Sequence, residues 1–170
     1  MTELEFVILH RENLPAVIRY VARRIPAGDV EPIVNEVFSI AWNKRGQCPA
    51  GYELPWLLRI ASLLIKNHQR KSKSQPLFLE LNTELDHDRI EPAAARGLDG
   101  LSQSELSERL VASWNKLSRG DREVLALVAF EELGPASLAR ALGITVNAAS
   151  IRLSRARKKL ETHMKEFGSD

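Results

Sequence analysis

Apolar residues recur at helical spacing along almost the whole chain, and this periodicity limits the possible folds more than any other feature of the sequence. The clearest series follows Asp29 and places apolar residues at i, i+3, i+4, i+7, i+8 and i+11: Val30, Ile33, Val34, Val37, Phe38 and Ala41. Such a series forms one buried face of an α-helix. No stretch alternates apolar and polar residues as a half-buried strand would. The sequence therefore predicts an all-α fold.

Three helix starts can be expected from local signals in the first part of the chain. An apolar stripe over residues 14–25 predicts a helix with Pro15 near its start. A shorter helix is expected before it, because residues 2–5 have the T-x-x-E spacing of a capping box. Asp29 is the expected N-cap of the next helix, so that Pro32 falls at the third helical position, where its missing N–H costs little.

A fourth helix is expected to begin near Pro55, with its apolar side chains directed inward. These side chains are Trp56, Ile60, Leu63 and Leu64. Trp42 and Trp56 both fit buried stripes and are expected in the core. Together these helices predict a compact domain over residues 1–72.

The chain has 170 residues and a formal net charge of only +2, but the charge is unevenly distributed. Residues 1–75 hold 11 Lys or Arg and 7 acidic residues, residues 76–110 hold 3 and 8, and residues 111–170 hold 10 and 7. A chain with basic segments at both ends and an acidic segment between them is expected to bind a polyanion through its ends. Residues 73–102 have weak periodicity and are expected to be an acidic linker to a second helical domain over 103–170.

The residues needed for catalysis or cofactor binding do not occur in recognisable patterns. Cys48 is the only cysteine, the four histidines lack metal-ligand spacing, and there is no glycine-rich phosphate loop. The longest early apolar run, residues 6–9, is far too short for a signal peptide or a membrane span. We therefore expect no catalytic site, no metal, no cofactor and no membrane insertion, and a cytoplasmic location.

Residues 134–160 have the layout of a helix-turn-helix. A short helix is expected to end at Gly143, which permits the positive φ of a tight turn. A second helix is expected to start after Thr145, its N-cap. Ala139 is small where the two helices would cross, and Ala149 would pack back from the second helix. This arrangement is typical of DNA-binding domains.

The helix predicted from Val146 has an apolar and a polar side. The apolar side, expected to be buried, is Val146, Ala149, Leu153, Ala156 and Leu160. The outward side and its flank hold Asn147, Ala148, Ile151, Arg152, Ser154, Arg155, Lys158 and Lys159. Asn and Arg can read base edges in the major groove, Ile or Ala can contact a thymine methyl, and the cations can anchor phosphates. This face is predicted to bind duplex DNA.

Six motifs occur in a characteristic order along the chain. The first predicted domain contains HRENLPAVIRYVARR, DVEPIVNEVFSIAW and PWLLRIASLL, and the second contains KLSRGDREVLAL, SLARALGIT and SIRLSRARKKL. They resemble regions two and four of the bacterial extracytoplasmic-function (ECF) sigma factors. The resemblance implies a non-catalytic protein that binds core RNA polymerase and directs it to promoters by contacting the −10 and −35 DNA elements. An acidic connector and often an anti-sigma factor partner belong to the same family pattern.

The resemblance and the helix geometry together assign candidate binding residues. For core RNA polymerase they are Glu31, Asn35 and Glu36. For the −10 strand they are Lys44, Arg45, Gln47, Lys66, Asn67, Arg70 and Lys71. For the −35 element they are Thr145, Asn147, Ala148, Ile151, Arg152, Arg155 and Lys158.

Other functions remain open at this stage. An autonomous helix-turn-helix regulator would bind a duplex tightly by itself, usually as a dimer on a palindrome, whereas a sigma factor binds weakly until core polymerase is present. A relative that only sequesters partners is a further alternative. The sequence departs from the usual ECF pattern at Pro32, Asn35, Ser62, Leu63, Asn67 and Ser137, as a divergent member would.

Overall fold

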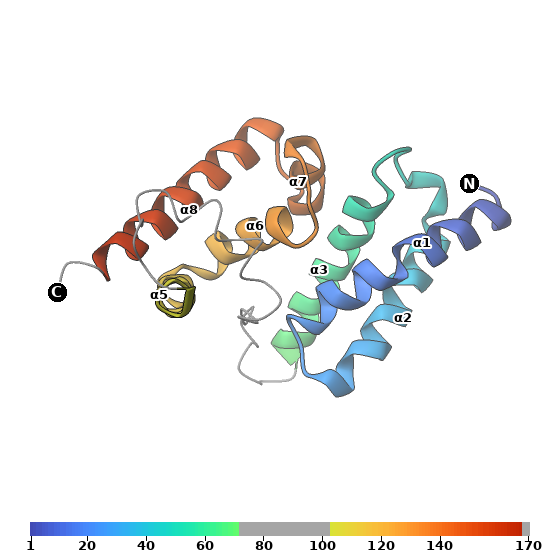
Figure 1. Ribbon diagram of the computed structural model, residues 1–170. Coiled ribbons are helices and arrows are strands. Elements are labelled where there is room, and N and C mark those ends of the chain that lie inside the picture. Colours follow the sequence, from blue (N-terminus) through green and yellow to red (C-terminus); the bar gives the residue numbers. More distant parts are fainter. Residues whose placement is uncertain (72–102, 168–170) are drawn as a thin grey trace. The chain divides into compact units, whose positions relative to one another are not determined.

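The computed structural model describes residues 1–71 and 103–167, and within these residues it contains helices and turns but no strand (Figure 1). The predicted all-α fold is confirmed. The predicted linker, residues 73–102, lies outside the described residues. Among the helices of the described residues, none is both long enough and apolar enough to cross a membrane.

The described residues form two compact units. The first unit holds residues 1–71 together with 136–145, and the second holds residues 103–135 together with 146–167. The division of the chain into the domains expected from its sequence stays a prediction.

Three helices of the first unit pack against one another: α1 (Glu3–Ala22), α2 (Ala27–Asn43) and α3 (Glu53–Lys71) (Figure 1). A short 3-10 helix, Arg45–Gln47, follows α2. The fully buried side chains between the helices are Val17, Val21, Val37, Ala41, Leu57, Leu58 and Ala61. Burying one Val or Leu side chain contributes about 1.5–3 kcal/mol to stability. Because these apolar side chains face inward, the polar residues of α2 and α3 lie on the outside.

Helix α1 is continuous, whereas the sequence predicts two helices. It begins with the predicted capping box, in which Glu5 N–H donates to Thr2 Oγ1 (3.3 Å) and Thr2 N–H donates to Glu5 Oε2 (2.6 Å). The helix then runs through the exposed Pro15. Buried side chains occur on both sides of this proline: Phe6, Leu9, Val17, Tyr20 and Val21. Their burial offsets the hydrogen bond that proline removes, and the predicted boundary near Pro15 is wrong.

Helix α2 starts at Ala27, and Asp29 is not its N-cap as predicted. The Asp29 carboxylate lies in the first turn and pairs with His68 Nε2 of α3 at 3.2 Å. Pro32 therefore occupies the sixth helical position rather than the third. At this position it does remove an intrahelical hydrogen bond, which the buried face compensates. That face is confirmed at Ile33, Val34, Val37, Phe38 and Ala41.

Helix α3 buries a face that the sequence predicts only in part. Ile60 is buried as expected, but Leu63 is 46% exposed, and Trp56 and Leu64 are only half-buried. The buried side consists of Pro55, Leu57, Leu58, Ile60, Ala61 and Ile65. Apolar residues surround most of this helix, so periodicity alone does not choose its inner face. Trp42 is also half-buried, with its ring edge-on to Phe6 at a centroid distance of 5.0 Å.

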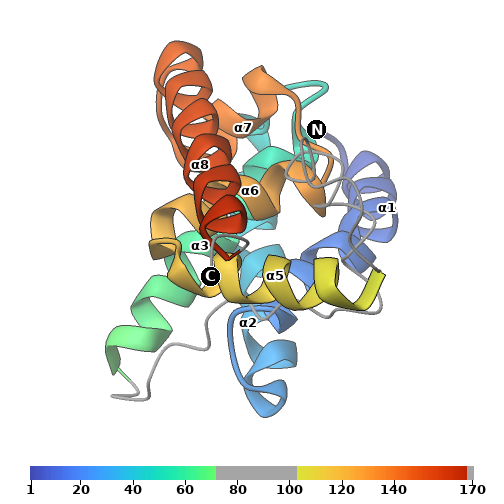
Figure 2. The same cartoon turned by 60° about the vertical axis from the view of Figure 1, so that its left-hand side comes forward.

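The second unit is built on α5 (Gln103–Lys116), α6 (Arg119–Ala129) and α8 (Val146–Glu166), and Figure 2 shows α5 crossing near the C-terminal end of α8. Their common core contains Leu106, Leu110, Trp114, Leu117, Leu125, Ala126, Phe130, Ala156, Leu160 and Met164. Trp114 is only 1% exposed. Ser118 caps α6, because its Oγ accepts the N–H of Asp121 at 3.2 Å. This core fixes α8 against α6.

Candidate nucleic-acid interface

The helix, turn and helix that the sequence predicts over residues 134–160 follow one another along the chain as α7 (Pro135–Leu142), a turn over residues 143–145, and α8. Gly143 has the predicted positive φ, 68°. The N–H of Gly143 donates to the carbonyl oxygen of Arg140 (3.1 Å), and the N–H of Ile144 donates to that of Ala139 (3.0 Å). These bonds end α7, and α8 starts directly after Thr145 as predicted.

One side of α8 is buried and the other is exposed, largely as the sequence predicts. Ala149, Ala156 and Leu160 are buried, and Leu153 is half-buried. Val146 is 49% exposed, so its predicted burial is wrong; as the first residue of α8 it has no preceding helical turn to shield it. The exposed residues of the predicted DNA face are Thr145, Asn147, Ile151, Arg152, Ser154, Arg155, Lys158 and Lys159, and Ala148 is half-buried.

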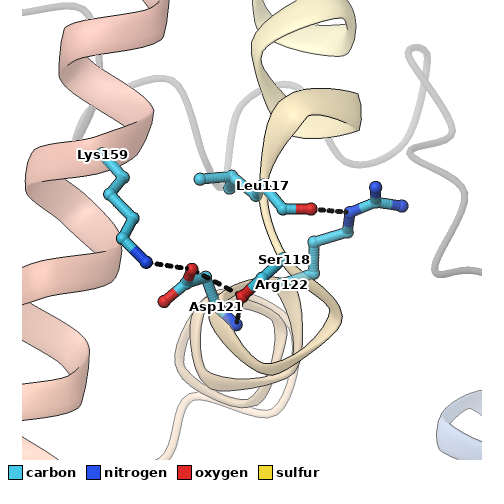
Figure 3. Close-up of polar contacts among 5 residues, drawn as sticks. All are labelled: Leu117, Ser118, Asp121, Arg122 and Lys159. Carbon is cyan, nitrogen blue, oxygen red and sulfur yellow. Dashed lines mark hydrogen bonds and ion pairs between the residues drawn. The ribbon is translucent and has the colours of Figure 1, made fainter.

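The cations on this face differ in their pairing. Within the described residues, Arg152, Arg155 and Lys158 form no ion pair. Lys159 does: its Nζ lies 2.6 Å from Oδ2 of Asp121, in the first turn of α6 (Figure 3). No acidic side chain of the described residues therefore competes with an external anion for the first three cations, while Lys159 is already partnered.

The Asp121 carboxylate is fixed at the start of α6. It accepts a hydrogen bond from Ser118 Oγ (2.6 Å) in addition to the one from Lys159 (Figure 3). Burial on its own would raise the pKa of Asp121, but the hydrogen bonds from Lys159 and Ser118 and the charge of Lys159 lower the pKa by more. The net pKa lies below the ordinary value of 3.8, so the group is ionised at neutral pH.

A cavity of about 240 Å³ lies between the start of α6 and α8. Its lining residues are Ser118, Gly120, Asp121, Val124, Arg152, Arg155 and Lys159. Three cations and one carboxylate make its wall positive, as a surface that meets phosphate requires.

The residues predicted for the −10 strand form two groups near opposite ends of α3. Lys44, Arg45 and Gln47 lie at the end of α2 and in the 3-10 helix, shortly before α3 begins. The others, Lys66, Asn67, Arg70 and Lys71, lie in the last turns of α3. Helix α3 rises by about 20 Å between Glu53 and Lys66. The structure does not bring the two groups into one pocket.

Two arginines of these groups are engaged by their neighbours. Arg45 Nη1 donates to the carbonyl oxygen of Trp42 (2.9 Å), and its guanidinium lies 4.1 Å from the centroid of the Trp42 ring. Arg70 Nη2 donates to Asn67 Oδ1 (2.5 Å). Arg45 is half-buried, whereas the other residues of both groups are exposed.

The residues predicted to contact polymerase, Glu31, Asn35 and Glu36, are all exposed on α2. They lie opposite the face that packs on α1 and α3. A partner can therefore reach them without disturbing the core of the first unit.

The pairing of Asp121 with Lys159 is the feature of the site that sequence analysis misses. The S-x-x-D spacing of residues 118–121 does indicate a helix start with an acid in its first turn. The lysine that this acid contacts lies 38 positions further along the chain. No local spacing rule covers that distance.

Comparison with known proteins identifies relatives of this chain. Residues 110–160 match the family described as Sigma-70, region 4. The RNA polymerase sigma factor CnrH of Cupriavidus metallidurans is 31% identical over 145 residues, which cover 80% of this chain and 73% of that protein. The RNA polymerase sigma factor NccH of Alcaligenes xylosoxydans xylosoxydans is 25% identical over 137 residues, with the same coverage of 80% and 73%.

Two solved structures have a similar fold. CnrH in complex with the cytosolic domain of CnrY gives a TM-score of 0.60 at 24% identity, covering 97% of this chain and 90% of that one. The sigma factor RpoE in complex with the anti-sigma factor NepR, from Bartonella quintana, gives a TM-score of 0.57 at 18% identity, covering 96% of both chains. At these identities the likeness concerns the fold.

An all-α chain with a helix-turn-helix and exposed cations on its second helix belongs to the helical DNA-binding proteins. The relationship to CnrH narrows the class: the chain belongs to the RNA polymerase sigma factors, in the ECF group. It is a sigma factor, the kind of protein that binds core RNA polymerase and promoter DNA and directs transcription initiation. This family consists of transcription factors rather than catalytic enzymes.

Proposed function

We propose that α8 reads the −35 element of the promoter. The observation that carries this assignment is the exposed polar side of α8, where Arg152, Arg155 and Lys158 form no ion pair within the described residues. Arg155 and Asn147 have the side chains that suit base edges, and Lys158 suits a backbone phosphate. The full contact set is Thr145, Asn147, Ala148, Ile151, Arg152, Arg155 and Lys158.

For the first unit we propose contacts with the −10 strand and with core polymerase. The −10 residues flank α3 over about 20 Å, which suits an extended single strand along the helix better than one closed pocket. Lys44, Lys66 and Lys71 would hold phosphates, Arg45 and Arg70 would do so from fixed positions, and the amides of Gln47 and Asn67 would meet bases. Glu31, Asn35 and Glu36 would contact polymerase from α2.

We also propose a cytoplasmic location, the absence of catalytic activity, and control by an anti-sigma factor. The last proposal is supported by the two structural relatives, of which CnrH is bound to the cytosolic domain of CnrY and RpoE to the anti-sigma factor NepR. An anti-sigma factor would act here by covering the polymerase-binding surface of the first unit.

The decisive experiment is transcription with purified core polymerase on genomic fragments. We expect defined transcripts that require the full chain, and weak duplex binding by the chain without polymerase. Tight binding of the isolated chain to a palindrome, as a dimer, together with no transcript from any fragment, would contradict the proposal and favour an autonomous regulator.

A template opened in advance at the −10 region separates the two DNA roles. Combined substitution Lys66→Ala and Lys71→Ala should reduce transcription from a closed template more than from the opened one. Combined substitution Arg152→Ala and Arg155→Ala should reduce transcription from both templates, because both keep the −35 duplex. The reverse pattern would contradict the assignment of the two regions.

A further inference from the structure

We infer that Asp121 withdraws Lys159 from the set of charges with which α8 contacts DNA, and so lowers the affinity of the chain for DNA of any sequence. The inference rests on the proposed role of α8 in binding duplex DNA. Asp121 and Lys159 line the same cavity as Arg152 and Arg155, so the carboxylate lies on the predicted DNA surface and not on a remote part of the unit.

The acid of this pair is held in place by its own helix. The Asp121 carboxylate accepts from Ser118 Oγ (2.6 Å), and the Asp121 N–H donates back to the same oxygen (3.2 Å). The Asp121 side chain is 15% exposed, whereas the Lys159 side chain is 54% exposed. Lys159 therefore comes to a carboxylate that is already positioned, and it would extend into solvent if that carboxylate were neutral.

The adjacent lysine provides the contrast. Lys158 precedes Lys159 on the exposed surface of α8 but has no acidic partner within the described residues. Spacing along the sequence identifies no acidic partner for either lysine. Among the residues that the structure describes, Lys158 has no ion pair, whereas Lys159 is half of a neutral pair.

Counterion release turns this difference into a measurable quantity. Each phosphate that a cation neutralises adds about 0.9 to the slope of log K against log salt concentration, and this electrostatic contribution does not depend on sequence. A lysine already neutralised by a carboxylate adds no net charge and should release few counterions. With one cation fewer, the chain binds DNA of arbitrary sequence more weakly, whereas the base contacts that α8 makes at promoters are unaffected.

The test measures binding of the full chain to a short duplex of random sequence at a series of salt concentrations. Asp121→Asn should steepen the salt slope by about 0.9 and tighten binding roughly five- to tenfold near 0.1 M salt, because Lys159 becomes a phosphate contact. Adding Lys159→Met to this variant should restore the slope of the unmodified chain. Asp121→Glu, which retains the charge, should leave the slope unchanged.

One further variant separates this effect from a change in net charge. Glu161 and Lys165 form another acid–lysine pair on α8 (2.7 Å), outside the cavity. Glu161→Gln adds the same positive charge as Asp121→Asn but should not steepen the slope by a full contact. Circular dichroism and thermal unfolding confirm that each variant is folded, and Asp121→Ser replaces Asp121→Asn if the latter is not.

The inference is overturned if Asp121→Asn leaves the slope unchanged or makes it shallower. It is also overturned if Glu161→Gln has the same effect, or if the double variant keeps the steeper slope. Lys158→Ala distinguishes this failure from failure of the proposed function. If Lys158→Ala reduces the slope by about 0.9 while Asp121→Asn does nothing, only the inference fails. If neither Lys158→Ala nor Arg155→Ala alters duplex binding, α8 is not the DNA surface and both fail.

Discussion

Three cations on α8 and two arginines of the first unit are held in different ways. Arg152, Arg155 and Lys158 extend from α8 without an ion pair in the described residues, whereas Arg45 stacks on Trp42 and Arg70 donates to Asn67. Uncommitted cations bind a duplex mainly by exchanging counterions, so their contribution depends steeply on salt. Side chains fixed by neighbours lose less conformational freedom when a ligand binds. The comparison teaches that the two surfaces, both proposed to bind nucleic acid, differ in how their cations are paired, so their binding should differ in its response to salt.

The largest effect should come from removing the support of α8. Trp114→Ala creates a cavity in the core that α5, α6 and α8 share, and should destabilise the second unit by about 3–5 kcal/mol. Urea denaturation followed by circular dichroism measures this loss. Duplex binding should disappear while the first unit still unfolds as before. The control is Leu63→Ala, at a position 46% exposed, which should change stability by less than about 0.5 kcal/mol. Equal stability of Trp114→Ala and the unmodified chain would contradict the packing described here.

A smaller effect should distinguish a base-reading cation from a phosphate-binding one within α8. Arg155→Ala should weaken promoter binding by polymerase holoenzyme by about 1–3 kcal/mol and relax the preference at one base pair. Lys158→Ala should weaken binding to all sequences alike and reduce the salt slope by about one. Fluorescence anisotropy on promoter duplexes that differ at single positions measures both effects. A uniform loss on every sequence for both variants would remove the distinction between them.

The fold could be predicted where a single local signal decides the structure and tertiary burial does not oppose it. The series after Asp29 occupies a single side of α2, so periodicity identifies its buried face. Gly143 combines a turn position with the residue that tolerates positive φ. Predictions are wrong where tertiary burial competes with a local rule, as at Pro15, where α1 continues because both of its halves are buried.

The candidate site likewise has features that the sequence predicts and features that it does not. The outward side of α8 follows from helix geometry, because its inner side carries only small and apolar residues, and the exposure of Ile151 at 43% agrees with that geometry. The partners of individual cations could not be predicted. Whether Lys159 is free or Arg45 is stacked depends on which side chains the packed helices bring together. That information is absent from spacing along the chain.

An effect of about 1 kcal/mol should separate the two neighbouring cations beside α3. Arg45→Ala removes a hydrogen bond and a contact over an aromatic ring, and should destabilise the first unit by about 1 kcal/mol. Lys44→Ala, at an exposed position, should leave stability within about 0.5 kcal/mol and should weaken binding to single-stranded −10 DNA with a shallower salt slope. Thermal unfolding and anisotropy on a single-stranded oligonucleotide give the two measurements. If Lys44→Ala is the more destabilising variant, the distinction between fixed and free cations fails in this unit.

The smallest effect concerns the acid that pairs with Lys159. The folded pKa of Asp121 lies below 3.8, although burial acts in the opposite direction, because hydrogen bonds from Lys159 and Ser118 favour the carboxylate. A depressed folded pKa contributes stability that is present above the unfolded pKa and is lost as pH falls through the folded pKa. The unmodified chain should therefore exceed Asp121→Asn in stability by less than about 1 kcal/mol at neutral pH, since Lys159 is largely exposed. This difference should shrink as the pH falls below 3.8. Urea denaturation of both proteins across that range measures it, and a difference that grows with acidity would mean that the carboxylate is destabilising in the folded chain.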